Sequence, residues 1–373
     1  MKTMKTAIVY DWIDKWGGVE RVLQVFAEMY PKADFYTSYY DREKAPWAKD
    51  LKIKTSFIQR FPDFIKKNRV LSLPFYPSAF ESFNFSQYDL VISVTSSFAK
   101  GVITKPGTKH ICYLLTPTRF LWSHSENYWD RNPITNAAAD FLRDWDLNAS
   151  RRPDKIISIS NHVAKRTKKY YQRESVVVYP PFDEKYWDGI KLQISKSKFQ
   201  TNPKYQILNT KYYLIVSRLE RYKKVDLAIK VFNKINKPLV IIGTGTQEEK
   251  LKELANPNIT FIKNISDEEL GRYYQRAEAL IMPQDEDFGM VTLEALYFGC
   301  PIISYKNSGV SEIVDDNKTG LLFAQQTEKS LTAAIERYGQ IAYNVKQITK
   351  RLGSKRVQKF SKKIFIDRFR KNL

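Results

Sequence analysis

Two glutamates on either side of a glycine form the segment with the clearest chemical potential. Glu286 and Glu294 have seven residues between them, with Phe288-Gly289 in that interval. The spacing predicts Glu286 on a loop, where it can bond hydroxyls of a ligand. Glu294 is expected two turns into the next helix, where it can accept both hydroxyls of a ribose. The first N–H groups of that helix lack partners within the helix and can bind a ligand. They belong to Phe288, Gly289, Met290 and Val291.

Cationic side chains follow a predicted strand earlier in the same half of the chain. The apolar run 212–216 leads into Arg218 and Lys223. An Arg guanidinium can hold a phosphate with parallel N–H groups, and a Lys ammonium supplies a compact positive charge. The turn Gly243-Thr244-Gly245 closes the following strand and permits close approach of a ligand. These residues predict a phosphate-binding edge, with a solvated basic loop as the alternative interpretation.

A second glycine turn lies near the N-terminus. A strand predicted at 7–10 ends before Asp11, and Gly17-Gly18 precede a helix expected from about Val19. Paired glycines let backbone N–H groups approach a phosphate, and a helix N-terminus adds partial positive charge. The turn predicts an anion site, with an ordinary tight turn as the alternative. It is not the G-x-G-x-x-G pattern of a dinucleotide-binding fold.

Short apolar runs must form the scaffold that positions these turns. The runs are continuous rather than alternating, which is typical of parallel strands buried on both faces. Helical patterns, such as 20–29 and 161–171, separate them as in βαβ crossovers. We expect strands at residues 7–10, 90–94, 110–115, 155–159, 212–216, 238–242, 259–262, 279–282, 301–304 and 321–323. The pattern predicts an α/β protein with two doubly wound domains.

Changes in composition suggest the domain boundaries. A polar, Lys-rich stretch follows Tyr179-Pro180-Pro181. We therefore expect an N-terminal domain at 1–185, a linker at 186–208, a C-terminal domain at 209–352 and a basic helix at 353–373. The apolar residues of this last helix recur at helical spacing, so it is expected to pack on the body of the protein, with a return to the N-terminal domain as one option. They are Val357, Phe360, Ile364, Phe365 and Phe369.

The overall composition describes a folded protein with a basic surface. Its 373 residues include 61 Lys and Arg against 40 Asp and Glu, a net charge of +21, and 43% are hydrophobic. Such a surface attracts phosphate in nucleic acid, lipid headgroups or small ligands. Two cysteines, Cys112 and Cys300, exclude a disulfide framework and a cysteine zinc site. Because no export signal or run of 18 apolar residues is visible, we expect a cytoplasmic protein with peripheral membrane contact only.

Together these segments resemble glycosyltransferase family 4, the retaining nucleotide-sugar enzymes of the GT-B fold. Arg218 with Lys223, Glu286 with Glu294, and SGVSEIV at 308–314 follow the family's C-terminal motifs in order and spacing. The N-terminal half is similar to bacterial mannosyltransferases of polysaccharide assembly, although Leu115 stands where that branch usually has a histidine. The matching N-terminal pieces are 10–12, 17–22, 98–102, 116–119 with Trp122, and 159–161.

The resemblance implies a hexosyltransferase, with mannose from GDP-mannose as the expected donor and a saccharide or lipid-linked saccharide as acceptor. Arg218, Lys223 and Glu286 would be catalytic, the two cations stabilising the leaving diphosphate in an interdomain cleft between Rossmann-like domains. Further donor contacts are expected from Gly17, Gly18, Gly243, Ile265, Phe288, Gly289, Met290, Val291 and Glu294. Acceptor or sugar contacts are expected from Asp11, Thr116, Arg119, Ser160 and Asn161.

No metal or other cofactor is expected for this chemistry. Two Asp-x-Asp strings, 144–146 and 285–287, would suggest a metal-bound diphosphate, but the first falls on a predicted helix and the second inside the glutamate motif. The three histidines, His110, His124 and His162, lack metal-ligand spacing.

Other interpretations remain open. The same motifs would serve UDP- or ADP-sugars, and a non-catalytic scaffold would be consistent with Leu115. A nucleic-acid-binding protein would use the basic charge, but the chain lacks P-loop, RRM, KH and zinc-finger motifs. An anionic membrane surface is an expected partner, because 49–69 and 75–85 mix Lys and Arg with aromatic residues. The alternative for these two segments is an aromatic core with solvated lysines.

Overall fold

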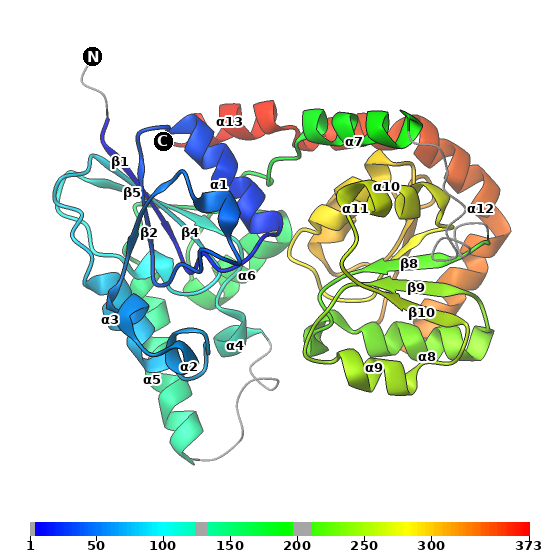
Figure 1. The fold of residues 1–373 in the computed structure, drawn as a ribbon, viewed down its shortest axis with the longest axis horizontal. Coiled ribbons are helices and arrows are strands. Elements are labelled where there is room, and N and C mark those ends of the chain that lie inside the picture. Colours follow the sequence, from blue (N-terminus) through cyan, green and yellow to red (C-terminus); the bar gives the residue numbers. More distant parts are fainter. Residues whose placement is uncertain (1–3, 124–132, 197–209) are drawn as a thin grey trace. The chain divides into compact units, whose positions relative to one another are not determined.

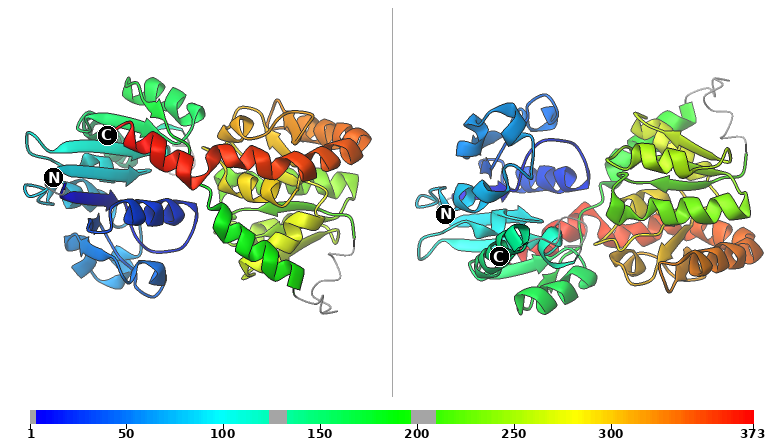
Figure 2. Two further views of the ribbon diagram at one scale, coloured as in Figure 1. Left: turned by 90° about the horizontal axis from the view of Figure 1, so that it is seen from above. Right: turned by 90° about the horizontal axis from the view of Figure 1, so that it is seen from below.

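The computed structural model describes residues 4–123, 133–196 and 210–373, which form two compact units. The first unit comprises Met1–Pro181 and Phe365–Leu373, and the second comprises Phe182–Ile364. In each unit, helices cover both faces of a parallel sheet (Figures 1 and 2). Two Rossmann-like α/β domains were expected, because continuous apolar strands need a covering layer on both sides.

The described part of the first unit has seven strands in the order β3-β2-β1-β4-β5-β6-β7. They are β1 (Thr6–Tyr10), β2 (Asp34–Thr37), β3 (Lys52–Thr55), β4 (Leu90–Thr95), β5 (Lys109–Leu114), β6 (Lys155–Ser158) and β7 (Val176–Val177). The strands predicted from apolar runs are confirmed as β1, β4, β5 and β6. The strands β2, β3 and β7 were not predicted from the sequence. The edge strand β3 exposes its lysines and β7 has only two residues, so neither contains a continuous apolar run.

Helices of the first unit connect these strands as crossovers. They are α1 (Gly18–Met29), α2 (Asp63–Lys66), α3 (Tyr76–Glu81), α4 (Arg119–Trp122), α5 (Pro133–Ala149) and α6 (Asn161–Tyr171). The predicted helix 161–171 coincides with α6, whose N-cap Ser160 accepts a hydrogen bond from Val163 N at 3.0 Å.

The described part of the second unit has six strands in the order β10-β9-β8-β11-β12-β13. They are β8 (Tyr213–Val216), β9 (Leu239–Ile242), β10 (Ile259–Ile262), β11 (Leu280–Met282), β12 (Ile302–Tyr305) and β13 (Gly320–Phe323). All six were predicted to within one residue at each end. The helices are α7 (Glu184–Lys196), α8 (Val225–Ile235), α9 (Glu248–Leu254), α10 (Asp267–Arg276), α11 (Met290–Tyr297) and α12 (Glu328–Val357).

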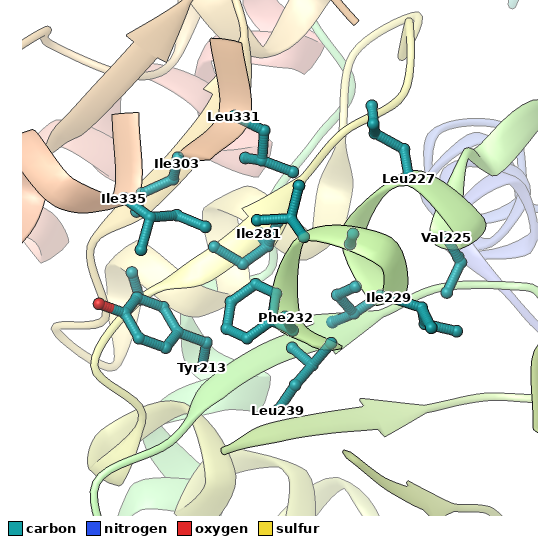
Figure 3. Packing of buried hydrophobic residues seen from close by; sticks show 14 of the residues in the cluster. Tyr213, Val225, Leu227, Ile229, Phe232, Leu239, Ile281, Ile303, Leu331 and Ile335 are labelled. Atoms are coloured by element: carbon teal, nitrogen blue, oxygen red, sulfur yellow. The ribbon is translucent and has the colours of Figure 1, made fainter. Parts of the chain in front are cut away.

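A hydrophobic core between the sheet, α8 and α12 fixes the second unit. Figure 3 shows part of it, with Phe232 of α8 and Ile335 of α12 gathered near Ile281 of β11. These side chains are at most 1% exposed. Since residues buried to this degree each contribute roughly 1.5–3 kcal/mol, the core gives the loops at the sheet edge a rigid base.

The strand orders create a topological switch point in each sheet. The chain moves outward in one direction from β1 and returns to β4 on its other side, and it does the same with β8 and β11. Loops at the carboxyl ends of such neighbouring strands diverge and leave room for a ligand. The turns singled out from the sequence follow β1, β8 and β11.

Part of the expected linker is a helix instead. Residues 184–196 form α7, in which Trp187 and Ile190 are buried while most neighbours are polar. Trp187 packs edge-on against Phe298, with 5.6 Å between ring centroids. Two apolar anchors one turn apart were too few to reveal a helical period in the sequence. The remaining linker residues, 197–208, lie outside the described residues.

The C-terminal stretch is two helices rather than one. The long α12 ends at Val357, a short 3-10 turn follows (Gln358–Phe360), and α13 spans Lys362–Arg370. Phe365 and Phe369 pack on Phe26 of α1, with ring centroids 5.5 and 4.8 Å away. The apolar side chains of α13 therefore bring the end of the chain back to the first unit. This return to the N-terminal domain was one of the options expected from the sequence. Within the described residues, no helix is long and apolar enough to span a membrane.

Candidate functional site

Two loops meet at the switch point of the second sheet. One follows β8 and contains Lys223; the other follows β11 and contains Glu286. The Lys223 ammonium and a Glu286 carboxylate oxygen lie 2.5 Å apart, and both side chains are mostly buried, at 12% and 14% exposed. The neighbouring positions of β8 and β11 bring together two residues that are 63 positions apart in the chain.

Further hydrogen bonds hold Glu286 in place. The Gln284 amide nitrogen donates to the same carboxylate oxygen at 2.9 Å, and Gly309 N donates to the Glu286 backbone carbonyl at 2.7 Å. Gly309 sits tightly on this loop, since a Cβ atom there would overlap the backbone carbonyl of Asp287. Gln284 was not among the predicted site residues, although its position two residues before Glu286 was an available indication.

Glu294 lies inside α11 next to the same loop. Its side chain is buried, and the Tyr274 hydroxyl donates to it at 3.1 Å. The helix begins after Gly289, which adopts a left-handed conformation with φ of 94° that glycine tolerates. Phe288 packs against Phe360, and Met290 and Val291 form the first turn, so the expected N–H donors are at a helix start. Tyr274, contributed by α10, was not predicted.

Arg218 is in the loop after β8 but has a different partner from Lys223. Its guanidinium donates to the Tyr222 hydroxyl at 2.6 Å, and the residue is exposed. Two cations of the loop are thus held in separate places. Lys223 is tied to a carboxylate, and Arg218 is held at the surface by an aromatic hydroxyl.

The glycine turn after β9 has a packing role of its own. Cβ atoms at Gly243 and Gly245 would overlap the backbones of Ser217 and Leu219. Leu219 N also donates to the Thr244 carbonyl at 2.8 Å. The turn therefore needs glycine in order to lie against the loop after β8. Ile265 follows β10, two strands away from β8, and is half-buried.

The first unit places Gly17 and Gly18 at the start of α1, at the end of the loop that follows β1. Glu20, in the first turn, is 1% exposed and accepts a hydrogen bond from the Tyr10 hydroxyl at 3.3 Å. Burial in the protein interior raises the pKa of Glu20 above its ordinary value. This buried carboxyl beside the glycine turn was not among the predicted site residues.

We expect Glu20→Gln to stabilise the protein increasingly as pH rises. The folded pKa of Glu20 is raised, so the folded state holds the proton more tightly, and stability falls as pH rises from the ordinary value of about 4.5 through the folded value. Gln imitates the protonated form. Each unit of upward shift is worth about 1.4 kcal/mol above both pKa values. Urea unfolding of both proteins from pH 4 to 8 measures the difference, and a constant difference across this range would contradict it.

Asp11 serves as an internal anchor. It is fully buried, and its carboxylate accepts from Thr95 Oγ1, Ser96 N, Phe98 N and Ala99 N at 2.8 to 2.9 Å. These bonds tie the end of β1 to the turn after β4. Ser96 Oγ is a fifth donor, at 3.3 Å, so the Asp11 oxygens are well supplied with partners inside the protein. The sugar contact expected from Asp11 stays a prediction.

Other expected acceptor residues lie at the same edge of the first sheet. Thr116 and Arg119 follow β5, and Ser160 and Asn161 follow β6. Thr116 and Ser160 are buried, and the Asn161 amide donates to the Tyr179 hydroxyl at 3.0 Å. The topology thus gathers residues from two separate motifs.

A buried ion pair supports the loop that carries Thr116. Lys100 and Asp146 lie 2.5 Å apart with both side chains 1% exposed. Asp146 also accepts hydrogen bonds from Thr118 Oγ1, Trp122 Nε1 and Tyr171 O–H at 2.7 to 2.8 Å. We call these five residues the Asp146 network. In the first Asp-x-Asp string, the Asp146 carboxylate is therefore bonded within this network. The Asp144 carboxylate is exposed on the other side of α5.

Within the described ranges, no cluster of three or more His, Cys, Asp or Glu residues could hold a metal ion. His110 is buried, with Nε2 2.8 Å from Ser93 Oγ, and burial lowers its pKa to about 3. His162 is in α6, and His124 lies outside the described residues.

Comparison with known proteins relates the second unit to one family. Residues 197–347 match the family described as Glycosyl transferases group 1. An uncharacterized glycosyltransferase of Haemophilus influenzae is 30% identical over 141 residues, covering 35% of this chain and 39% of the relative. A glycogen synthase of Thermodesulfovibrio yellowstonii is 33% identical over 141 residues, covering 35% and 28%. The alpha-1,3/1,6-mannosyltransferase ALG2 of Candida glabrata is 25% identical over 290 residues, covering 63% and 61%.

Solved structures match the fold over nearly the whole chain. Anabaena Alr3699/HepE, determined in complex with UDP and glucose, has a TM-score of 0.69 at 16% identity and covers 99% of both chains. WaaG, a glycosyltransferase involved in lipopolysaccharide biosynthesis, has a TM-score of 0.68 at 13% identity, covering 96% and 98%. The fold is therefore GT-B. The chain spans 28% to 50% of the length of the first curated relatives that it matches.

Proposed function

We propose that this protein is a retaining glycosyltransferase that moves a hexose from a nucleotide sugar to a saccharide or lipid-linked saccharide. The observation that carries the proposal is the mostly buried Lys223–Glu286 pair at the β8/β11 switch point, next to the start of α11. A cation, a hydroxyl-binding carboxylate and the N–H groups of a helix start suit a sugar diphosphate. The match of residues 197–347 to Glycosyl transferases group 1 supports it.

In the proposed reaction the bond between the sugar C1 and the phosphate oxygen breaks, and the acceptor oxygen forms a new bond to C1. The acceptor attacks from the face that the diphosphate leaves, and its proton passes to the departing phosphate. Lys223 and Arg218 stabilise the negative charge that grows on the diphosphate. Glu286 positions the sugar hydroxyls, and Glu294 binds the ribose. These steps use the chain's own residues without a metal.

We propose GDP-mannose as the donor. The relation to the mannosyltransferase ALG2, over 63% of this chain, supports this choice. UDP- and ADP-sugars are the alternatives, since glycogen synthases also match and HepE was determined with UDP and glucose. We propose that the glycine turn at Gly17 and Gly18 supplies further N–H donors to the donor phosphates. Gly243 and Ile265 are proposed to contact the nucleobase.

A thermal-shift screen against GDP-, UDP-, ADP- and dTDP-sugars tests the donor. A ligand at about 100 times its dissociation constant should stabilise the folded state by roughly 2.7 kcal/mol. We expect a shift with GDP-mannose that is reduced in Glu294→Gln, which keeps an oxygen acceptor for the Tyr274 hydroxyl. Glu278→Gln, a half-buried glutamate before β11 and so at the opposite edge of the sheet, is the control. A shift with none of the donors would contradict the proposed function.

A further inference from the structure

Exposed apolar side chains concentrate in one short segment of the first unit. Among the described residues, 13 large hydrophobic side chains are exposed, and five of them fall within residues 57–75. These five are Phe57, Phe64, Val70, Leu71 and Phe75, which we call the apolar patch. Phe64 is 69% exposed and Val70 is 76% exposed. Soluble proteins rarely leave so many large apolar groups together at a surface without a partner for them.

The patch is held on an ordered support. Ile58 and Ser72 are fully buried, and Ser72 Oγ donates to the Ile65 carbonyl at 2.7 Å. The Asn68 side-chain oxygen accepts from Val70 N at 3.0 Å and Leu71 N at 3.2 Å, which forms a tight turn. The exposure of Val70 and Leu71 is therefore a property of this turn.

Aromatic packing fixes the neighbouring part of the support. Phe61 packs edge-on against Phe75, with ring centroids 5.0 Å apart, and also contacts Phe57 at 5.8 Å. The short helix α2 (Figure 1) follows Phe61 in the chain. Phe64 is its second residue. Phe57 and Phe75 thus keep one side on the protein and leave another side exposed.

Basic residues are interspersed with the patch. Residues 57–75 contain Arg60, Lys66, Lys67 and Arg69 against the single acidic residue Asp63. Arg69 is held by Asp14 at 2.6 Å and lies 4.0 Å from the centre of the Trp12 ring. Lys66 and Lys67 pair with Asp63 at 2.8 and 2.6 Å. Four basic residues minus one acidic residue leave this segment with three surplus positive charges.

The second segment expected to contact a membrane has a different role. Apart from Phe75, its large aromatic residues belong to the core: Tyr76, Phe80 and Phe85 are at most 2% exposed. For most of 75–85, the alternative interpretation of an aromatic core is therefore the one that the structure supports. Across the described residues 49–85, the exposed large apolar side chains all fall within 57–75.

We propose that the apolar patch inserts into the headgroup region of an anionic lipid bilayer, with Arg60, Lys66 and Lys67 against the lipid phosphates. Apolar side chains entering the boundary between headgroups and acyl chains, with cations beside them, are the two components of peripheral membrane binding. A protein partner would need complementary acidic groups, whereas an anionic bilayer supplies negative charge over any area. The proposal concerns a surface of the first unit and goes beyond the proposed donor site.

Vesicle co-sedimentation of the full chain, without any donor, tests this proposal. The probes are vesicles of phosphatidylglycerol mixed with phosphatidylcholine, and vesicles of phosphatidylcholine alone. We expect binding to the anionic vesicles that weakens as salt increases. The triple variant Phe64→Ser, Val70→Ser, Leu71→Ser should bind about tenfold or more weakly, because it removes three groups that enter the bilayer.

A matched triple variant tests whether vesicle binding depends on the apolar patch or on any exposed apolar side chains. Ile103→Ser, Phe141→Ser and Val176→Ser change three other exposed apolar residues of the same unit and should leave vesicle binding within twofold. Absence of wild-type binding, equal binding to neutral vesicles, or equal losses in both triple variants would overturn the proposal. So would self-association in analytical ultracentrifugation that the patch variant abolishes while vesicle binding persists. Thermal shifts with the nucleotide sugars in the patch variant report separately on the donor site.

Discussion

Replacing Lys223 by Met is expected to lower the rate of donor turnover by about a hundred- to thousandfold. That range is typical when one preorganised group that stabilises developing charge is removed. Lys223 is held 2.5 Å from Glu286 at 12% exposure, so its charge is fixed in position and only partly screened by water. Charge on the diphosphate is greater in the transition state than in the bound donor, so kcat should fall more than donor affinity.

Release of nucleoside diphosphate from the donor identified in the thermal-shift screen measures this effect, since slow hydrolysis needs no acceptor. Met keeps the apolar stem of Lys, and Gln284 still donates to Glu286 in the variant. Lys224→Met, the exposed neighbour, is the matched control and should turn over the donor at close to the wild-type rate. Equal losses in the two variants would show that the Lys223–Glu286 pair has no special part in the reaction.

The second large effect is on stability. We expect Asp146→Asn to reduce the free energy of unfolding by about 3–5 kcal/mol, because it leaves the Lys100 charge buried and uncompensated. The substitution changes volume little and keeps an oxygen for hydrogen bonds from Thr118, Trp122 or Tyr171. A loss of stability in Asp146→Asn therefore reports the lost charge pairing and not a loss of packing.

Urea unfolding followed by circular dichroism provides the measurement. Asp144→Asn, two residues away and exposed, should change the free energy of unfolding by less than about 0.5 kcal/mol. The double variant Lys100→Met, Asp146→Asn removes both charges and should recover much of the loss. If the double variant is as unstable as Asp146→Asn alone, the cost does not come from an unpaired buried charge.

The Asp146 network also holds the segment after β5 that contains the expected acceptor contacts Thr116 and Arg119. Thr118 is the N-cap of α4, and Trp122 is its last residue, so both ends of this short helix are tied to one carboxylate. Thr116 and Arg119 lie on the same stretch. A variant that weakens the network is therefore expected to disturb this loop before the parallel sheet itself.

Local patterns were sufficient for most of the scaffold. Ten strands followed from short continuous apolar runs, and α6 followed from its helical pattern, because burial on both faces of a strand and helical periodicity are recorded in neighbouring residues. Where the local pattern was weak, prediction failed. The edge strand β3 exposes its lysines, and α7 shows only two buried apolar residues.

Local sequence patterns established the fold class and placed Arg218, Lys223, Glu286 and the Gly17-Gly18 turn on loops or helix starts at strand ends, with Glu294 inside the helix that follows Glu286. They could not determine which of these side chains meet. The strand order decided that Lys223 meets Glu286, and the packing of α10 on α11 placed Tyr274 beside Glu294. Arg218 instead bonds to Tyr222 within its own loop. Tertiary burial likewise decided that Asp11 and Asp146 are internal anchors and that Phe64 and Val70 remain exposed. The physical reason is that local periodicity records which face of an element is apolar, whereas contacts between distant residues depend on how the sheet orders its strands and on which charges it encloses.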